Sequence, residues 1–414
     1  MDTAGTPPAA PAPAPAWQVA VLAGLKAGGV GTVAHVPDLV LAGLIRLAEA
    51  DGGLAVYAPA KEEEGLGILC GAYLGGQRGA LLLQNSGAGN LVNVLASLAV
   101  PYQLPVLLLI SQRGGLHEFN PAQVGMAQAL RPVLDALGVP HVTLSRLDEV
   151  PPIVEGASAL AFQTERPVAL ILDPLLTGGK KGLPAYGAEE PAAPPAAPGG
   201  PARRRPPRTD SGPGPAGVIR RQEGVRALVG ALRDELVVTG LGYAAFDVYA
   251  AGDRARNFYL SGALGSAASV AFGLAGARPG ERVVCVDGEG SLLANLGALA
   301  TIGRYRPPNL TLVVLDNGMF QITGGQATHT AFGTDLARVA RGCGIESVRT
   351  VAALDDLAAA FRTMLDTPGP HVLVAKVDGQ RSAGYQPRKG VLVKARFMHA
   401  LGVQPDVEAL AWPT

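Results

Sequence analysis

Short apolar runs alternate with longer stretches rich in Ala, Gly and Leu on both sides of a proline-rich segment. Short runs of this kind are typical of buried strands, and the longer stretches are typical of helices. The first half contains such runs at 32–37, 54–59, 80–84, 105–111, 141–144 and 167–173. The second half contains them at 236–240, 257–260, 282–287, 310–317, 347–350 and 371–377. The pattern predicts an α/β protein with two doubly wound parallel sheets.

Two segments are too rich in Pro and Ala to form a packed core. Residues 1–16 are mostly Pro, Ala and Thr, and residues 183–217 combine repeated Pro with three consecutive Arg. Chains of this composition bury too little apolar surface to offset the entropy that ordering costs. We therefore expect a disordered tail at 1–16 and a linker at 183–217. The two domains are expected at 17–182 and 218–414.

The charge balance gives no reason to expect a polyanionic partner. Lys and Arg together number 34, as do Asp and Glu, so neither nucleic acid nor a membrane surface is predicted as a partner. The apolar runs are too short to cross a bilayer, and the first residues lack the features of a signal peptide. The cysteines and histidines are scattered, which argues against disulfides and a transition-metal site. We expect a cytoplasmic protein.

Two motifs follow neighbouring strands of the second half. Gly288-Glu289-Gly290-Ser291 follows the run at 282–287, and Asn317 ends the next run. Glycines let a backbone approach a phosphate, and carboxylate and amide oxygens are ligands that Mg²⁺ prefers. Because ligands of open parallel sheets bind beyond the carboxyl ends of the strands, the two motifs are expected to meet. Together they predict a diphosphate and metal site.

This pair of motifs resembles the cofactor signature of thiamine-diphosphate-dependent enzymes, which runs from Gly-Asp-Gly to a pair of Asn. The resemblance implies that the side chains of Glu289 and Asn317 and the carbonyl of Met319 hold Mg²⁺. Glu289 stands where the family has Asp, and Asp316 stands where it has the first Asn. Mg²⁺ demands near-ideal octahedral geometry, so the longer Glu side chain is expected to weaken metal binding without abolishing it.

The same resemblance assigns residues to the rest of the cofactor. In the segment 261–266, Leu264 stands where the family has a large aliphatic residue that wedges the cofactor into a bent shape. The segment 239–242 is a further candidate phosphate loop. The residues expected to contact thiamine diphosphate are Gly240, Gly262, Leu264, Gly288, Gly290, Ser291 and Asn317.

Three adjacent glutamates open a helical stretch of small residues in the first half. Acids are favourable at a helix N-terminus, and for Glu62 and Glu64 we expect no more than a solvated helix end. Glu63 lies two residues before Gly65 and ten before Tyr73, which resembles the pyrimidine-binding domain of the same enzymes. The resemblance implies that Glu63 shares a proton with the aminopyrimidine, which activates the cofactor. Glu63 is the predicted catalytic acid.

Further motifs resemble one branch, the sulfopyruvate and phosphonopyruvate decarboxylases. They lie at 84–90, 111–114, 118–123, 256–259, 292–297 and 323–326. In sulfopyruvate decarboxylases the two halves can be separate subunits, so the chain resembles their fusion. The reaction implied first is the decarboxylation of 3-sulfopyruvate to sulfoacetaldehyde. Decarboxylation of phosphonopyruvate, carboligation and a silent cofactor-binding protein remain alternatives.

An anionic substrate tail needs fixed donors, and polar residues of the first half are the candidates. They are Asn85, Ser86, Asn90 and Arg113, with a structural ion pair as the alternative role for Arg113. His35 and His117 are candidates for proton transfer, although a lone loop histidine is more often structural. Because the family commonly pairs domains across subunits, a homodimer or homotetramer is expected.

Overall fold

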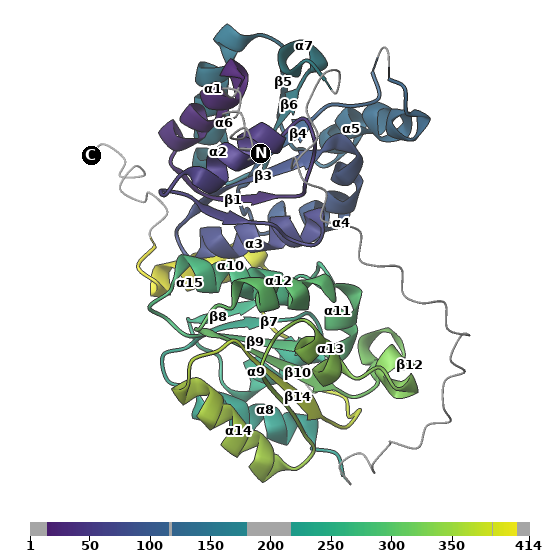
Figure 1. Cartoon of the computed structure of the whole chain (residues 1–414). Helices are drawn as coiled ribbons and strands as arrows, with labels where there is room; N and C mark the ends of the chain where they lie inside the picture. Colours follow the sequence, from purple (N-terminus) through teal and green to yellow (C-terminus); the bar gives the residue numbers. More distant parts are fainter. Residues whose placement is uncertain (1–14, 116–117, 180–216, 383, 404–414) are drawn as a thin grey trace, which may run out of the picture.

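The computed structural model describes residues 15–115, 118–179, 217–382 and 384–403. Two six-stranded sheets, one in each half of the chain, lie one above the other with helices on their faces (Figure 1). Every neighbouring pair of strands within them is parallel. The predicted doubly wound α/β fold is confirmed. The predicted tail lies almost wholly outside the described residues, and so does the predicted linker.

The sheet of the first half has the strand order β2-β1-β3-β4-β6-β5. Its strands are β1 (Val30–His35), β2 (Ala55–Tyr57), β3 (Arg78–Gln84), β4 (Leu107–Ser111), β5 (His141–Leu144) and β6 (Val168–Leu172). Its helices are α1 (Ala16–Ala27), α2 (Ala42–Ala50), α3 (Glu62–Leu74), α4 (Val92–Val94), α5 (Val124–Ala136), α6 (Val150–Thr164) and α7 (Pro174–Thr177). The short turns η1 (Asn85–Leu91) and η2 (Leu95–Ala99) flank α4.

The sheet of the second half has the order β13-β14-β10-β9-β7-β8. Its strands are β7 (Leu236–Thr239), β8 (Asn257–Tyr259), β9 (Val283–Gly288), β10 (Leu310–Asp316), β13 (Ser347–Val351) and β14 (His371–Lys376). Its helices are α8 (Arg221–Ala231), α9 (Tyr243–Ala251), α10 (Ala267–Ala277), α11 (Glu289–Ala294), α12 (Gly297–Tyr305), α13 (Leu336–Gly342), α14 (Leu354–Asp366) and α15 (Gly390–Ala400). A small hairpin, β11 (Met319–Phe320) and β12 (Gln326–Ala327), was not predicted.

The two sheets share one topology. If β7 is matched to β1, β8 to β2, β9 to β3, β10 to β4, β13 to β5 and β14 to β6, the two strand orders are identical. Each predicted apolar run overlaps one of these strands. In this correspondence α10, between β8 and β9, is the counterpart of α3, between β2 and β3. The chain therefore contains an internal structural repeat, with one copy in each half.

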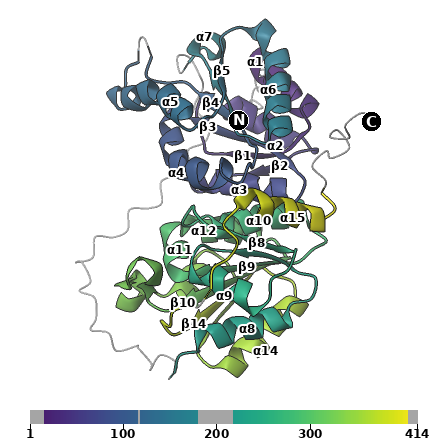
Figure 2. The ribbon, with the colours of Figure 1, turned by 180° about the vertical axis from the view of Figure 1, so that it is seen from behind.

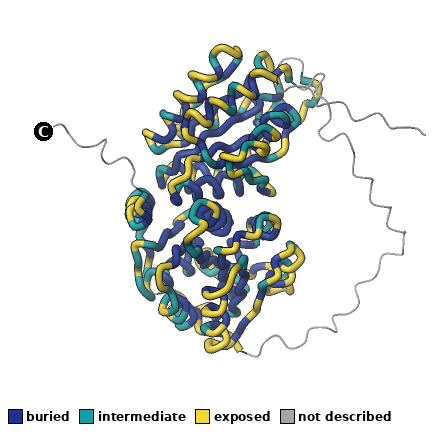
Figure 3. Tube along the Cα trace, turned by 60° about the vertical axis from the view of Figure 1, so that its left-hand side comes forward, coloured by how far each residue is buried: buried dark blue, intermediate teal, exposed yellow. Residues whose placement is uncertain are grey.

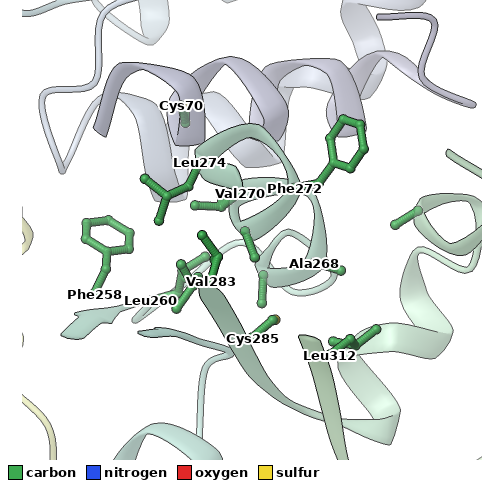
Figure 4. Close-up of a cluster of buried hydrophobic side chains, with 14 of the residues drawn as sticks. Cys70, Phe258, Leu260, Ala268, Val270, Phe272, Leu274, Val283, Cys285 and Leu312 are labelled. Carbon is green, nitrogen blue, oxygen red and sulfur yellow. The ribbon is translucent and has the colours of Figure 1, made fainter. Parts of the chain in front are cut away.

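These two counterpart helices join the halves. A Cβ added to Gly71 of α3 would overlap the carbonyl oxygen of Val270, and one added to Gly273 of α10 would overlap that of Ile68. Gly67 lies beside Ser269, and Gly75, just after α3, lies beside Ala277, so the helices run in the same direction. Only glycines allow backbones to approach this closely. Cys70, Val270 and Leu274 lie in the cluster between the helices (Figure 4) and belong to a core that includes both halves.

The C-terminal helix α15 packs along the seam between the halves (Figures 1 and 2). Its buried Lys394 lies 2.8 Å from Glu165 and donates to the carbonyl of Gln103 at 3.0 Å, both in the first half. Tyr102 donates to the carbonyl of Tyr259 at 2.9 Å and accepts from the backbone N–H of Ser261 at 2.8 Å. These contacts fix the segment that precedes α10 against the first half.

Buried residues concentrate in the strands of both sheets (Figure 3). Strands covered on both faces read as continuous apolar runs, which explains why the sequence pattern located them. In the parts of the chain that the structure describes, no helix is long and apolar enough to span a bilayer.

Candidate active site

A cavity of about 220 Å³ opens at the carboxyl ends of β7, β9 and β10. Its lining residues come from the loop that enters α9, the start of α11 and the segment after β10. The predicted residues that line it are Leu264, Gly288, Glu289, Gly290, Ser291, Asn317 and Met319. Nothing lies within 4 Å of a Cβ built on Gly288, so this backbone is open to a ligand. The predicted diphosphate motifs therefore meet at one cavity.

Two predicted glycines support this cavity from outside its lining. A Cβ on Gly240 would overlap the carboxylate of Asp287, which accepts from the backbone N–H of Gly288 at 2.9 Å. Complete burial raises the pKa of Asp287 to about 7. A Cβ on Gly262 would lie 2.8 Å from the carbonyl oxygen of Ser97 in the first half. Both glycines permit close backbone contacts that shape the loops around the site.

The predicted metal ligand Glu289 and the neighbouring Asp316 are both buried acids. Glu289 is 2% exposed and accepts a hydrogen bond from Thr328 at 3.1 Å. Asp316 accepts from Thr330 at 2.8 Å and pairs with Lys376. Burial, and secondly the charge of Asp316, raise the pKa of Glu289 to about 7. The local environment thus opposes a free negative charge at Glu289.

A divalent cation would remove that conflict. It would compensate the negative charge of Glu289, and the carbonyl-type oxygens of Asn317 and Met319 would complete an oxygen ligand set of the kind that Mg²⁺ prefers. No group of three or more His, Cys, Asp or Glu side chains suited to a metal occurs among the described residues. The proposed ligand set is not such a group, because only Glu289 is an acid. Asn317 would contribute its amide oxygen and Met319 its backbone carbonyl. The donor set fits Mg²⁺.

The loop predicted to wedge the cofactor is held in an unusual backbone conformation. Ala263 and Gly265 have φ values of 55° and 91°. The N–H of Gly265 donates to the Ser291 hydroxyl at 3.1 Å, and its carbonyl accepts from Asn295 at 3.2 Å. Between them Leu264 lines the cavity and is 45% exposed. A large apolar side chain so presented has a surface available for a bound ring.

Glu63 lies at the end of the first half that approaches this loop. Residues four apart share a helix face, so Glu63, Gly67 and Gly71 form one stripe of α3. A Cβ built on Gly67 would lie 2.9 Å from the Ser269 side chain of α10 and 3.8 Å from the carbonyl oxygen of Ser266, which precedes α10. Since the helices run in the same direction, Glu63 is one turn nearer the segment that carries Leu264. Its side chain is 22% exposed and pairs with Lys61 at 3.0 Å.

The flanking glutamates differ from the expected solvated helix end. Glu64 is 1% exposed and accepts from the N–H of Ala60 at 2.8 Å. It also bonds to Thr301 of α12, and burial raises its pKa. Glu62 accepts from Asn90 at 2.7 Å. The solvated interpretation of Glu64 was wrong, because α12 of the other half covers this side chain.

Comparison with known proteins identifies the chemistry. The family profile of the C-terminal TPP binding domain of thiamine pyrophosphate enzymes matches residues 242–375. A phosphonopyruvate decarboxylase of Streptomyces viridochromogenes is 35% identical over 84% of this chain and 85% of its own length. A sulfopyruvate decarboxylase of Methanosarcina acetivorans is 31% identical over 83% of this chain and 87% of its own. The chain belongs to this family of thiamine-diphosphate-dependent decarboxylases.

Other relatives show that the two parts of such a decarboxylase need not share a chain. The beta subunit of a sulfopyruvate decarboxylase from Methanocaldococcus jannaschii matches 40% of this chain at 36% identity, over 88% of its own length. The alpha subunit from Methanococcus maripaludis matches 38% of this chain at 38% identity, over 93% of its own length. The fold is also that of a 4-hydroxybenzoylformate decarboxylase from Rhodococcus jostii, with TM-score 0.66 and 14% identity over 87% and 99% of the chains.

Two of the decarboxylase's four substrate candidates form one tight loop contact. Asn85 is fully buried and exchanges hydrogen bonds with the backbone of Arg113, at 3.1 and 3.2 Å. Arg113 binds Glu118 through two nitrogens, at 2.8 and 2.5 Å. The Arg113 guanidinium, through hydrogen bonds to the Glu118 carboxylate, holds the pKa of Glu118 down at about 2. The alternative of an ion pair is therefore what the structure shows for Arg113.

The other two candidates lie on η1. Ser86 donates to Gln84 at 2.8 Å, and Asn90 donates to Glu62 at 2.7 Å beside the start of α3. Both residues are exposed. Asn90 therefore lies beside Glu62, and both Ser86 and Asn90 have donors or acceptors available to solvent.

Only one of the two candidate histidines of the decarboxylase lies among the described residues. His117 lies outside the described residues. His35 ends β1 and is 5% exposed, and neither ring nitrogen has a hydrogen-bond partner within the described structure. Burial lowers the pKa of His35, although Glu49 lies 3.6 Å away. Burial thus favours the neutral form of this ring, which lies at the carboxyl end of β1.

A buried arginine beside the cavity escaped the sequence analysis. Arg221 is 2% exposed, pairs with Asp247 at 2.7 Å and lies over the Tyr243 ring at 4.8 Å. It also binds Gln321, a neighbour of the predicted ligand Asn317. Arg221 and Asp247 are 26 residues apart, and no local pattern connects them. Only the packing of α8 against α9 brings them together.

Proposed function

We propose that this decarboxylase converts 3-sulfopyruvate to sulfoacetaldehyde and CO₂ in a non-oxidative reaction that depends on thiamine diphosphate and Mg²⁺. The observation that carries the proposal is the contact of Gly67 with Ser266 and Ser269, which places Glu63, one helical turn earlier, toward the loop of Leu264; that loop lines the cavity together with Glu289 and Asn317. A cofactor with a ring system and a diphosphate needs an acid for the pyrimidine ring, an apolar loop and a diphosphate site close together. The two halves of a single chain supply them.

Phosphonopyruvate is the second candidate substrate. The identity with a phosphonopyruvate decarboxylase is 35%, against 31% for a sulfopyruvate decarboxylase of similar coverage. Both substrates place a tetrahedral anion next to a 2-oxo acid. Residues that bind one tail therefore have donors suited to the other, and the two differ in charge at neutral pH.

The residues of the chain have separate tasks in the proposed reaction. When bound, thiamine diphosphate supplies the carbon nucleophile and the electron sink for decarboxylation. Glu63 would share a proton with the pyrimidine ring of the bound cofactor. Leu264 would contact the rings of the cofactor, and Glu289, Asn317 and the Met319 carbonyl would hold Mg²⁺.

Decarboxylation of the substrate breaks one carbon–carbon bond and consumes one proton. The bond between C1 and C2 breaks, its electron pair remains at C2, and CO₂ leaves. A proton then takes that pair, and the aldehyde is released. His35 is our candidate for this proton transfer because it ends β1 and both nitrogens of its buried ring lack a hydrogen-bond partner within the described structure. Proton transfer by His117 is proposed on the sequence alone.

The anionic tail is proposed to bind on the face of η1 and the start of α3. Ser86 and Asn90 offer donors there, and Lys61, 46% exposed, adds a positive charge beside Glu63. Asn85 and Arg113 shape this region through their mutual contact. Because Glu118 neutralises Arg113, the arginine contributes less attraction than a free guanidinium would.

We also propose that two or four copies assemble in solution. Large apolar side chains are exposed on loops of both halves, including Phe119 at 78% and Phe332 at 79%. Such side chains gain the most from burial when a partner subunit covers them. Light scattering behind size-exclusion chromatography tests this proposal, and a monomer at micromolar concentration would contradict it.

The substrate is tested by comparing kcat/KM for 3-sulfopyruvate, phosphonopyruvate and pyruvate, with CO₂ and aldehyde measured together. We expect one aldehyde per CO₂ and the highest kcat/KM for 3-sulfopyruvate. A higher value for phosphonopyruvate would replace the proposed substrate. CO₂ release with a hydroxyketone product would indicate carboligation, and cofactor binding without turnover would indicate a silent binder.

A further inference from the structure

The side-chain amide of Asn317 has two hydrogen-bond partners. Its oxygen accepts from the backbone N–H of Met319 at 3.0 Å, and its nitrogen donates to the side-chain oxygen of Gln321 at 3.0 Å. All three residues line the cavity. An amide presents an oxygen on one side and an NH₂ group on the other, and only the oxygen can bind a cation. The orientation of this amide therefore decides whether Asn317 is a ligand.

Arg221 determines which end of Gln321 faces Asn317. A guanidinium has donors only, so the Gln321 atom that contacts Arg221 must be the oxygen. The same oxygen accepts from Asn317, and the Gln321 nitrogen donates to the carbonyl of Gly379. With the Gln321 oxygen so assigned, the Asn317 atom facing it must be the nitrogen. The Asn317 oxygen is then directed to the other side.

Arg221 is itself firmly held. It is 2% exposed, binds Asp247 at 2.7 Å and donates to the Gln380 carbonyl at 2.5 Å. Ser382 accepts a further hydrogen bond from it at 3.1 Å. These partners hold Arg221 in place, and its guanidinium has donors only. Arg221 therefore always donates to Gln321, and the order of donors and acceptors from Arg221 through Gln321 to Asn317 has one direction.

We propose that Gln321 is a positioning residue that keeps the Asn317 oxygen directed toward the metal, with its own orientation set by Arg221. The inference rests on the proposed Mg²⁺ site. Gln321 is not one of the proposed metal ligands. It acts by preventing the amide of Asn317 from turning its NH₂ group into the ligand position.

The test compares Gln321→Met in two backgrounds. Met removes the acceptor oxygen at similar size, so the Asn317 amide loses one of the two bonds that orient it. A typical hydrogen bond contributes enough to predict Mg²⁺ binding about three- to tenfold weaker. In the Asn317→Asp background both terminal atoms are oxygens, so orientation no longer matters. There Gln321→Met is expected to weaken Mg²⁺ binding no further.

Binding is measured by calorimetric titration of Mg²⁺ into protein saturated with thiamine diphosphate, without turnover. Gln321→Glu, which keeps an acceptor for both Arg221 and Asn317, is expected to bind Mg²⁺ at least as tightly as wild type. An equal loss in both backgrounds, or no loss in either, would overturn the proposal. If Glu289→Gln binds Mg²⁺ like wild type, the metal site itself is misplaced, and that failure is distinct from a failure of Gln321.

Discussion

Gly71 of α3 and Gly273 of α10 make reciprocal contacts, each with the backbone carbonyl of a residue in the other helix. This contact sets the separation of the two halves. It also sets the distance between Glu63, one turn before Gly67, and the loop that carries Leu264. The predicted catalytic acid and the predicted cofactor loop are thus positioned by a glycine contact two helical turns from Glu63.

Gly71→Ala is predicted to force α3 and α10 apart, because a Cβ there would overlap the Val270 carbonyl. Overpacking of this kind costs about 1–3 kcal/mol. We expect a lower free energy of unfolding in urea and weaker binding of thiamine diphosphate. Gly156→Ala is the matched control, since nothing lies within 4 Å of a Cβ at this exposed site of α6. Unchanged cofactor binding in Gly71→Ala would show that the helix contact does not position the site.

Mg²⁺ affinity is predicted to depend on pH through Glu289. Burial raises the pKa of Glu289 to about 7, so below that pH a proton occupies the carboxyl and Mg²⁺ must displace it. The affinity should therefore fall by up to about tenfold per pH unit as the pH drops below about 7, and it should be constant above. Calorimetric titrations from pH 6 to 8 check this.

Two variants separate Glu289 from its neighbour in this experiment. Burial also raises the pKa of Asp287 to about 7, so a pH effect could arise there. Asp287→Asn is expected to keep the pH dependence, whereas Glu289→Gln should lose measurable Mg²⁺ binding. A pH-independent affinity in the wild type would argue that Glu289 is not a ligand.

The structure predicts that each chain builds its site from its own halves. The α3–α10 contact lies within one chain, and it directs the end of α3 that carries Glu63 toward the loop of Leu264 in the same chain. Co-expression of Glu63→Gln with Glu289→Gln, carrying different tags, is therefore expected to give mixed oligomers without activity. Every site would contain one damaged half. Recovery of a substantial share of wild-type activity would show instead that the halves of different chains pair around the cofactor.

The strands were predictable because their apolar character is local. Residues 107–111 and 310–315 are buried on both faces of parallel sheets, so the sequence itself records their environment. The motifs at 288–291 and 317 were predictable for a related reason. They follow strands directly, and the ends of adjacent parallel strands must lie together.

The residues that escaped prediction depend on distant packing. Glu64 looks like an exposed acid at a helix start, and its burial follows from α12 of the other half. Arg221 meets Asp247 only because α8 and α9 pack together. By contrast, Arg113 and Glu118 are five residues apart, and their opposite charges in one loop were a local signal for the ion pair that the structure contains.

The most direct test of the account is CO₂ release from 3-sulfopyruvate by wild type, Glu63→Gln and Glu62→Gln, each with thiamine diphosphate and Mg²⁺. The wild type and Glu62→Gln should release CO₂. Glu63→Gln should still bind the cofactor and lose about 10²-fold or more in kcat, because it cannot share a proton with the pyrimidine ring. Equal loss in Glu62→Gln, or retained turnover in Glu63→Gln, would contradict the assignment of the catalytic acid.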